Sequence, residues 1–196
     1  MRKLLIVLTA ALVLAACGSQ PTAQRTQHHP SPSASASAKA SASPAAGAVV
    51  PTKVTIQSIG LSASVEKVGV DQYGDMAIPV DPHNLGWYSP GVKPGAPGDA
   101  VIDGHYDWYG MPQGPLFKLT SVKAGDEIDI TSADGNTLTF KVTAPATAVP
   151  YDSHPAGLFR TDGAPTLTLI TCGGEWDASK NTYTERELLN ATLVKK

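Results

Sequence analysis

The sequence predicts one mostly β domain whose strands close into a barrel. Two observations lead to this prediction. From Val49 onward, short apolar runs alternate with turns rich in Gly, Pro and Asp, and no stretch has the periodicity of a long amphipathic helix. Several short strands at such spacing are typical of a closed barrel. We therefore expect helical structure only as short helices or 3-10 turns in loops.

Three strands are expected in the first two thirds of this domain. Val54 and Ile56 alternate with polar residues, residues 100–102 form a short apolar run, and Ile128 and Ile130 again alternate with polar neighbours. A period of two is the pattern of a strand with one face buried. Each of these segments therefore predicts a strand.

The clearest strand pairing is a hairpin that joins residues 127–131 to residues 137–143. Asp134-Gly135 lies between the two runs and is a common turn pair. One face of the second run carries three apolar side chains, Leu138, Phe140 and Val142. The two segments are therefore expected to pair side by side in the barrel.

A further strand is predicted at residues 166–171, where Thr and Leu alternate before Ile170. Leu167 and Leu169 share one face by parity, so the side chain of Cys172 is expected on the opposite face, away from the core. Gly173-Gly174 is expected to end this strand. The loop-rich segments 106–119 and 144–165 are expected to cover a cleft beside it.

The terminal strand is expected at residues 186–194. It begins at Arg186, and its more apolar face carries Leu189, Ala191 and Leu193. Parity places Arg186 on the other face, toward a cleft. The only other arginine of the predicted domain is Arg160, which falls in a loop where a solvated side chain is expected.

Composition and the N-terminal segment set the cellular context. The chain has 196 residues, a formal net charge of −2 and a pI near 6.2, so it has room for one domain and lacks the basic excess of a nucleic-acid-binding protein. Residues 1–17 comprise a basic start, a short apolar run and Leu14-Ala15-Ala16-Cys17-Gly18. This end resembles a lipobox, in which Cys17 becomes the lipidated N-terminus; an uncleaved hydrophobic anchor is the alternative.

Residues 18–48 are rich in Ser, Ala and Pro and are expected to form a disordered linker between the signal segment and a domain at residues 49–196. The chain has two cysteines, Cys17 and Cys172, and a disulfide between them is the ordinary expectation for an exported protein. Lipidation of Cys17 would instead leave Cys172 as a free thiol, either buried or reactive.

Three side chains have the types that thiol catalysis requires. Cys172 is the candidate nucleophile, His105 the candidate proton-transfer group, and Arg186 the candidate cation for a developing negative charge. His83 and His154 lie in Pro- or Asn-containing segments and are interpreted as turn histidines. The triplet Asp103-x-His105-x-Asp107 also allows a metal site, which we consider the weaker interpretation because no second cluster completes it.

These residues resemble a known family, the sortases, which are cysteine transpeptidases of Gram-positive cell surfaces. Thr168-Leu169-Ile170-Thr171-Cys172 resembles their T-L-x-T-C strand, and the likeness covers about residues 50–196. It extends through four further segments: residues 56–63, Gly86-Trp87-Tyr88, residues 94–105 and residues 114–119. The likeness is greatest to the actinobacterial class F group.

The resemblance implies an eight-stranded sortase β-barrel, catalytic roles for His105, Cys172 and Arg186, and no cofactor or metal. It further implies a thioacyl intermediate, secreted substrates with a C-terminal LPXTG-like sorting signal and a cell-wall amine acceptor. The enzyme would lie on the extracytoplasmic face of the membrane of a Gram-positive, actinobacterial cell, with Cys17 as its lipid anchor. One departure is that class F members often carry the arginine two residues earlier, in a Tyr-Arg-Asp context, where Tyr183-Thr184-Glu185 stands here.

Two other functions are compatible with parts of this pattern. An L,D-transpeptidase acting on peptidoglycan would share the thioacyl chemistry, but it would favour an S-x-G-C context where Leu169-Ile170-Thr171-Cys172 stands. An extracytoplasmic binding lipoprotein with a sortase-like barrel and little turnover is the non-enzymatic alternative. The presence of Cys172, His105 and Arg186 together argues against it.

Overall fold

The computed structural model describes residues 47–194, and the predicted signal segment with Cys17, together with residues 18–46 of the predicted linker, lies outside them. Two 3-10 helices are described, η1 (Gln57–Ile59) and η2 (Leu119–Ser121). The described strands are β1 (Pro51–Ile56), β2 (Leu61–Val68), β3 (Leu85–Tyr88), β4 (Asp99–Gly104), β5 (Glu127–Ser132), β6 (Thr137–Val142), β7 (Thr147–Pro150), β8 (Thr166–Asp177) and β9 (Thr182–Leu193). Within this part of the chain, no helix has the length and apolar character to span a membrane.

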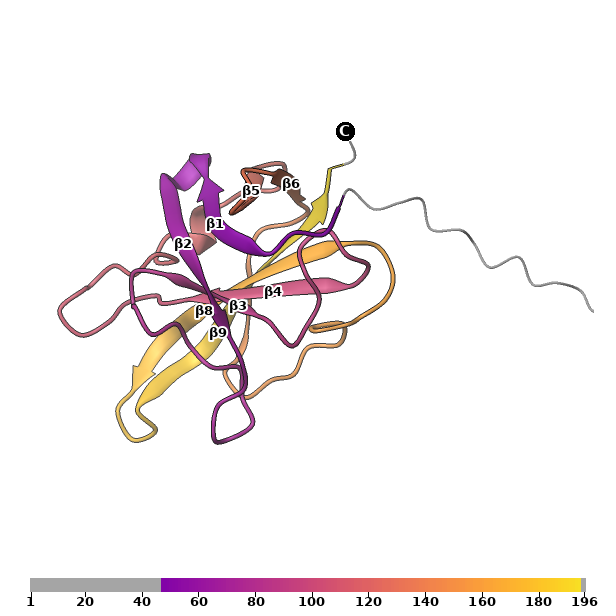
Figure 1. The fold of residues 1–196 in the computed structure, drawn as a ribbon. Helices are drawn as coiled ribbons and strands as arrows, with labels where there is room; N and C mark the ends of the chain where they lie inside the picture. The colour runs from indigo at the N-terminus through magenta and orange to yellow at the C-terminus, as the bar shows by residue number, and fades with distance from the viewer. Residues whose placement is uncertain (1–46, 195–196) are drawn as a thin grey trace, which may run out of the picture. The chain divides into compact units, whose positions relative to one another are not determined.

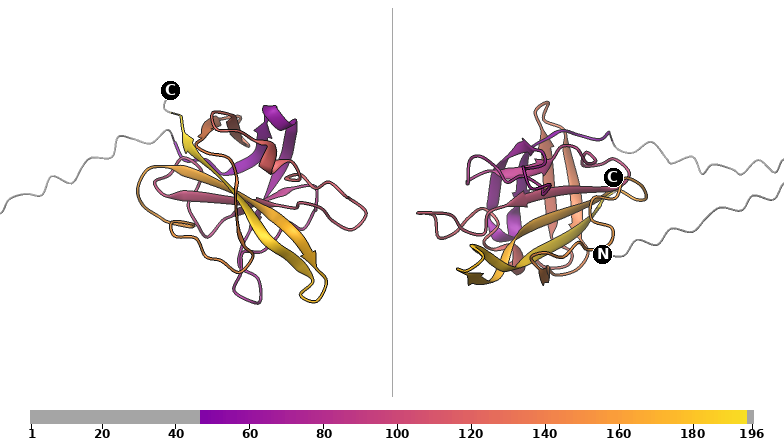
Figure 2. Two further views of the ribbon diagram at one scale, coloured as in Figure 1. Left: turned by 180° about the vertical axis from the view of Figure 1, so that it is seen from behind. Right: turned by 90° about the horizontal axis from the view of Figure 1, so that it is seen from below.

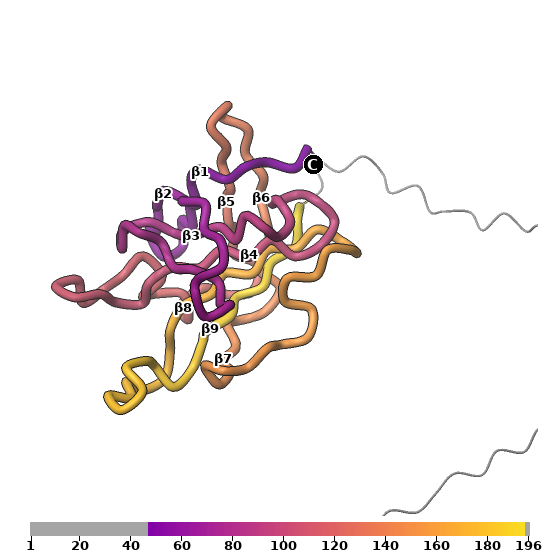
Figure 3. Tube along the Cα trace, turned by 60° about the horizontal axis from the view of Figure 1, so that its bottom comes forward, coloured from indigo at the N-terminus to yellow at the C-terminus, as the bar shows by residue number. Residues whose placement is uncertain are grey.

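Eight of these strands form a closed barrel, as predicted. Their order is β6-β5-β1-β2-β3-β4-β8-β9, and the ring closes because β6 also pairs with β9. β9 is long enough to have two partners on one edge, since residues Ala191 to Leu193 pair with β6 and residues Glu185 to Leu188 pair with β7. β7 is therefore a ninth strand attached outside the ring. Figure 1 labels the strands of the ring, and Figure 3 shows β7 beside β9.

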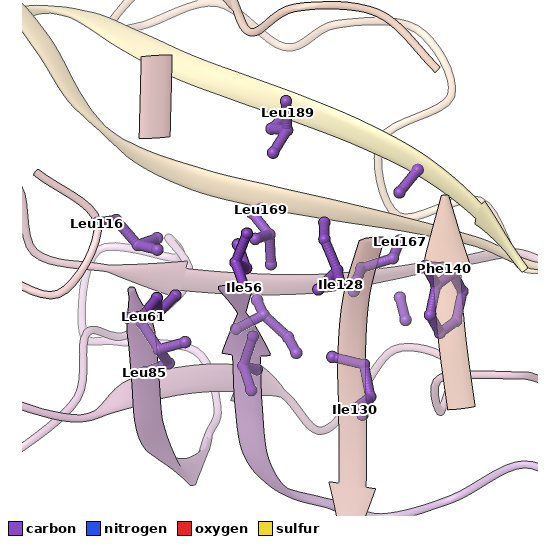
Figure 4. Close-up of a cluster of buried hydrophobic side chains, with 14 of the residues drawn as sticks. Ile56, Leu61, Leu85, Leu116, Ile128, Ile130, Phe140, Leu167, Leu169 and Leu189 are labelled. Atoms are coloured by element: carbon purple, nitrogen blue, oxygen red, sulfur yellow. The ribbon is translucent and has the colours of Figure 1, made fainter. Parts of the chain in front are cut away.

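The barrel interior is filled by apolar side chains that alternate along the strands. Val54, Ile56, Ile128 and Ile130, which the sequence placed on one face of two strands, are fully buried. Figure 4 shows Ile56, Ile128 and Ile130 among interior side chains that converge from several strands. Burying a large aliphatic side chain stabilises the fold by about 1.5–3 kcal/mol, so this cluster fixes which face of each strand points inward.

The hairpin predicted at residues 127–143 is confirmed. Ile128 pairs with Phe140 and Ile130 with Leu138, while Asp134-Gly135 lies in the connecting loop. Gly135 has a φ of +83°, a conformation that side-chain-bearing residues rarely adopt. The glycine is therefore required by the turn.

Two expected boundaries were wrong. Gly173-Gly174 does not end the strand, because β8 continues to Asp177 and pairs with the first half of β9 through a bulge. Gly174 provides the positive φ of +72° in this bulge. β9 begins at Thr182, so Arg186 lies within the strand. The loop-rich segment at residues 144–165 also contains the short strand β7. The resulting long β8–β9 hairpin projects from the barrel (Figure 2).

Phe140 tests the closure of the barrel, since it is fully buried on β6 and pairs with Leu193 of β9. Phe140→Ala should lower the free energy of unfolding by about 3–5 kcal/mol, as expected for a large side chain deleted from a close-packed core. Lys141→Ala, at the adjacent exposed position, should change it by less than about 0.5 kcal/mol. Urea denaturation measures both, and equal losses would contradict the assigned core.

Candidate active site

The strand register places the three predicted site residues in one row. Cys172 of β8 pairs directly with Arg186 of β9, and directly paired residues present their side chains on the same face of a sheet. On its other side, β8 runs parallel to β4, with Asp103 opposite Ile170. Extended by two residues, past the end of β4 at Gly104, this register brings His105 opposite Cys172. The row therefore reads His105, Cys172, Arg186 across three neighbouring chain segments.

This row lies on the outer face of the barrel. Leu167 and Leu169 of β8 and Leu189 of β9 are fully buried in the interior. Cys172 and Arg186 are an odd number of residues from these leucines, so their side chains lie on the opposite face. The parity prediction for both residues is confirmed by this arrangement.

Cys172 is half-buried and forms no disulfide with any residue that the structure describes. Burial is the largest influence on it and raises its pKa above the ordinary range, whereas the positive charge of Arg186 lowers the pKa. The negative charges of Asp107 and Asp103 raise it further. A thiol in this environment is mostly protonated at neutral pH, so a nearby base is needed to make it nucleophilic.

His105 is the candidate base, and the extended register of β4 places it opposite Cys172. Its side chain is buried, with 9% exposed, and this desolvation lowers its pKa, an effect that the charge of Asp107 partly offsets. Nε2 is buried and has no hydrogen-bond partner among the described residues. The indole ring of Trp108 packs on the imidazole with a centroid separation of 4.5 Å. His105 is therefore a neutral imidazole with one nitrogen free to exchange a proton.

A hydrogen bond between β8 and β4 fixes the position of His105 along the strand direction relative to the thiol. The hydroxyl of Thr171, which is buried beside Cys172, donates to the carbonyl oxygen of Gly104 at 2.8 Å. This hydrogen bond links the end of β4 to β8 one residue before His105 and one residue before Cys172. The sequence context Thr171-Cys172 and Gly104-His105 thus has a direct structural role.

Arg186 is held by its own strand rather than by an acid. Nη1 donates to the carbonyl oxygen of Glu185 at 3.0 Å, and Nη2 donates to the hydroxyl of Thr182 at 3.3 Å. The ring of Tyr151 lies 5.9 Å from the guanidinium carbon. Arg186 forms no ion pair with any described residue, because those pairs join His83 to Asp81 and Lys180 to Asp177. Its charge remains available to an anion formed at Cys172.

Arg160 has a different position, and its partly exposed side chain is bonded within its own loop. Nη2 donates to the carbonyl oxygen of Ala164 at 2.7 Å and to the hydroxyl of Thr166 at 2.8 Å, and Nη1 donates to the carbonyl of Asp162. These contacts close the loop that leads into β8. Arg160 is therefore occupied in holding this loop and lies outside the row of Cys172.

The remaining titratable candidates lie outside the row. His83 is exposed and contacts Asp81 through Nδ1 at 3.0 Å, and His154 is exposed. No three His, Cys, Asp or Glu side chains gather as a metal site within residues 47–194, so Asp103, His105 and Asp107 do not converge on a common point.

The sequence did not assign functions to Asp103, Asp107 or Tyr183. Asp103 is covered by its surroundings, which raises its pKa to about 7, and its Oδ1 fills the space where a Cβ on Gly86 would lie. The Tyr183 hydroxyl donates to Asp107 at 2.5 Å, a bond that raises the pKa of Tyr183 to about 12. The triplet around His105 was the only available signal, and it had suggested a metal.

The outer face is hollowed further along the same strands. A cavity of about 260 Å³ lies between the loop at residues 155–160 and the outward side chains Thr168, Leu188 and Asn190. Thr168 is four residues from Cys172, or about 13 Å along the strand. A larger hollow of about 400 Å³ lies between η1, β2 and the loop at residues 111–118, and Cys172 does not line it. Cys172 lines neither of these two cavities, but the smaller one lies on the outer face that carries the thiol.

Comparison with known proteins gives a consistent result. The family described as "Sortase domain" matches residues 54–194. Among solved structures, the chain is similar to a lid mutant of sortase A from Corynebacterium diphtheriae, with 26% identity over 77% of this chain and 73% of that one, and a TM-score of 0.57. No curated protein sequence matches the chain.

Two further structures are similar in fold. Sortase C-1 from Actinomyces oris is 23% identical over 76% of this chain and 75% of its own length, with a TM-score of 0.57. Sortase C1 from Streptococcus agalactiae is 19% identical over 74% of this chain and 67% of its own, also with a TM-score of 0.57.

Arg186 should control the reactivity of the thiol. Arg186→Gln removes the positive charge that lowers the pKa of Cys172, so the pKa should rise and alkylation by iodoacetamide at neutral pH should slow several-fold. The pH profile of alkylation, followed by mass spectrometry at the Cys172 peptide, measures this shift. Arg160→Gln is the matched control and should leave the profile unchanged; the reverse ranking would remove Arg186 from the site.

Proposed function

The chain belongs to the sortase family, and from this premise we propose that it is a cysteine transpeptidase that joins sorting-signal proteins to an amine acceptor. The observation that carries the proposal is the row of His105, Cys172 and Arg186 on the outer face of the barrel. This row combines a thiol, a neutral base and an unpaired cation beside an open face. Each is a component that acyl transfer requires.

The proposed first step forms a thioacyl-enzyme. His105 accepts the proton of Cys172, the sulfur attacks the backbone carbonyl carbon of the sorting signal, and the negative charge collects on the carbonyl oxygen. His105 then gives its proton to the leaving amine as the carbon–nitrogen bond breaks. The half-buried thiol with a raised pKa suits this sequence, since its proton leaves as the substrate reacts.

Arg186 is proposed to stabilise the oxyanion of this intermediate. Its guanidinium bonds only to neutral acceptors of its own strand, so a new negative charge beside Cys172 would be its first anionic partner among the described residues. A charge-assisted hydrogen bond is roughly twice as strong as a neutral one, and the site is partly shielded from water. This favours the transition state over the bound substrate.

The substrate is proposed to be the C-terminal LPXTG-like signal of a secreted protein. A peptide extended over the outer face of β4 and β8 covers about 3.3 Å per residue, so four residues span the distance from Cys172 to the cavity at Thr168 and Asn190. We propose that this cavity receives the part of the signal that precedes the scissile bond. No cofactor or metal is part of the proposal.

The subtype and location are proposed on sequence grounds. The likeness through residues 56–63, 86–88, 94–105 and 114–119 favours the actinobacterial class F group. The lipobox-like residues before Cys17 favour a lipid anchor at the extracytoplasmic face of the membrane. The partners would then be secreted proteins, a cell-wall amine and the membrane itself. A binding lipoprotein with little turnover is the alternative function.

A covalent adduct tests the proposal. The protein, incubated with an LPXTG-like peptide, should gain the mass of the acyl fragment at Cys172, and glycine-type amines should release a transpeptidation product. Cys172→Ala should abolish the adduct with the fold intact, and His105→Ala should lose turnover. Peptide binding without any adduct would favour the binding lipoprotein, and cleavage by the Cys172→Ala protein would exclude Cys172 as the nucleophile.

The two arginines should differ in their effects on the rate. Arg186→Ala should lower the rate of acylation about 10²–10³-fold with near-normal stability, the usual cost of losing one oxyanion donor. Arg160→Ala removes contacts within the loop that lines the proposed peptide cavity, so it should raise the KM for the peptide while the acylation rate at saturating peptide stays within a few-fold of wild type. Single-turnover kinetics at saturating peptide separates the two, and a larger loss at Arg160 would transfer the role to that residue.

Anchoring through Cys17 is tested separately from catalysis. Cys17→Ala should block lipid attachment and signal processing in the native host, because the thiol itself is the modified group. Metabolic labelling with a fatty-acid analogue measures the attachment, and Cys172→Ala is the matched control that should retain the label. Label that persists in the Cys17→Ala protein would place the lipid elsewhere or favour an uncleaved anchor.

A further inference from the structure

We propose that Asp107 is the acceptor-binding residue of this enzyme: its carboxylate receives the ammonium group of the incoming amine beside Cys172, and Tyr183 orients that carboxylate. The inference rests on the proposed transpeptidase function and names the site of its second substrate. The class of ligand is a primary amine that is cationic at neutral pH.

Asp107 is held next to the nucleophile by contacts from both sides. It lies two residues beyond His105, which the register places opposite Cys172. Its carboxylate accepts a hydrogen bond from the hydroxyl of Tyr183 on β9 at 2.5 Å. In the sheet, β8 lies between β4 and β9, so this bond links the two segments that flank the strand of the nucleophile.

The two neighbours of Asp107 are also fixed. The ring of Trp108 packs against His105 at 4.5 Å, and the ring of Tyr106 packs against that of Tyr183 at 5.6 Å. The Tyr183 ring makes a further edge contact with Trp176, at 5.3 Å. The position of the carboxylate is therefore set by four aromatic side chains and is independent of any bound ligand.

The carboxylate of Asp107 forms no ion pair with any described residue. Among the described residues the ion pairs are His83 with Asp81 and Lys180 with Asp177, so Asp107 has no cationic partner. The nearby cation, Arg186, is bonded to Glu185, Thr182 and Tyr183 through neutral acceptors. A half-buried carboxylate with one neutral hydrogen bond can still accept a cation.

This charge is unfavourable for the first half of the reaction. The negative charge of Asp107 raises the pKa of Cys172, so it opposes the thiolate that attacks the peptide. Once the thioacyl bond has formed, the sulfur carries no charge and this opposition disappears. An anion at this position therefore favours the second half of the reaction, when a cationic amine must come to the thioacyl carbon.

Resolution of the thioacyl-enzyme by a cationic amine releases one proton. The ammonium bound at Asp107 gives one proton to His105, which passes it to solvent. The neutral nitrogen then attacks the thioacyl carbon, a carbon–nitrogen bond forms, and the carbon–sulfur bond breaks. The second proton moves from nitrogen through His105 to the departing sulfur, so the products are an amide, the free thiol of Cys172 and one released proton.

The test measures how a preformed thioacyl-enzyme divides between nucleophiles. The adduct with an LPXTG-like peptide is formed first and quantified by mass spectrometry, and then triglycine, which is cationic at neutral pH, or hydroxylamine, which is largely uncharged, is added. Asp107→Asn should raise the triglycine concentration needed for half-capture about tenfold, equivalent to about 1.4 kcal/mol. Hydroxylamine capture should stay within a few-fold of wild type.

Two further variants separate binding from positioning. Tyr183→Phe keeps the carboxylate but removes the hydrogen bond that orients it, so the preference for triglycine over hydroxylamine should fall part of the way toward that of Asp107→Asn. Asp107→Glu keeps the charge and should retain most of the preference. Complete loss of the preference in Asp107→Asn, with a smaller fall in Tyr183→Phe, supports an amine site. A preference unchanged in Asp107→Asn, or an equal fall for both nucleophiles, would overturn it. Absence of any adduct in the wild-type protein would instead contradict the transpeptidase function, and the acceptor site with it.

Discussion

The pairing of β8 on both of its edges is the interaction on which the site depends. β8 runs parallel to β4 and antiparallel to β9, and these two registers together bring His105, Cys172 and Arg186 to one height. Leu167 and Leu169 fix the face, because a slip of one residue would bury the thiol and expose both leucines. The barrel core thus specifies the active-site geometry without any contact to a substrate.

The same burial that holds the strands also sets the chemistry. Desolvation raises the pKa of Cys172 and lowers that of His105, so both groups rest in their neutral forms. The charge of Arg186 lowers the pKa of Cys172 and so opposes the neutral thiol. The charge of Asp107 raises the pKa of both groups, which favours the neutral thiol and disfavours the neutral imidazole. At rest, the neutral pair of Cys172 and His105 therefore lies between the cation Arg186 on β9 and the anion Asp107 beyond the end of β4. This arrangement suits a reaction in which an anionic intermediate forms first and a cationic nucleophile arrives second.

Local patterns predicted the parts of the fold that depend on one buried face. The alternation at Val54 and Ile56, the hairpin at residues 127–143 and the outward parity of Cys172 and Arg186 all follow from burial with a period of two. The errors arose where contacts between segments far apart in the sequence determine the local structure. Gly173-Gly174 fits a strand end or a bulge equally well, and only the first half of β9 selects the bulge. The contact of Asp107 with Tyr183 joins residues 76 apart and has no local signal.

The register of β4 against β8 can be measured directly by forming disulfides with Cys172. Neighbouring strands lie about 4.8 Å apart and a disulfide needs a Cα separation of about 4.4–6.8 Å, whereas a shift of two residues increases the separation to about 8 Å. Under mild oxidation, we expect His105→Cys to link to Cys172 and Asp103→Cys to leave Cys172 free, as read by mass spectrometry of the Cys172 peptide. A link from position 103 and none from position 105 would contradict the row on which the proposed catalytic site is built.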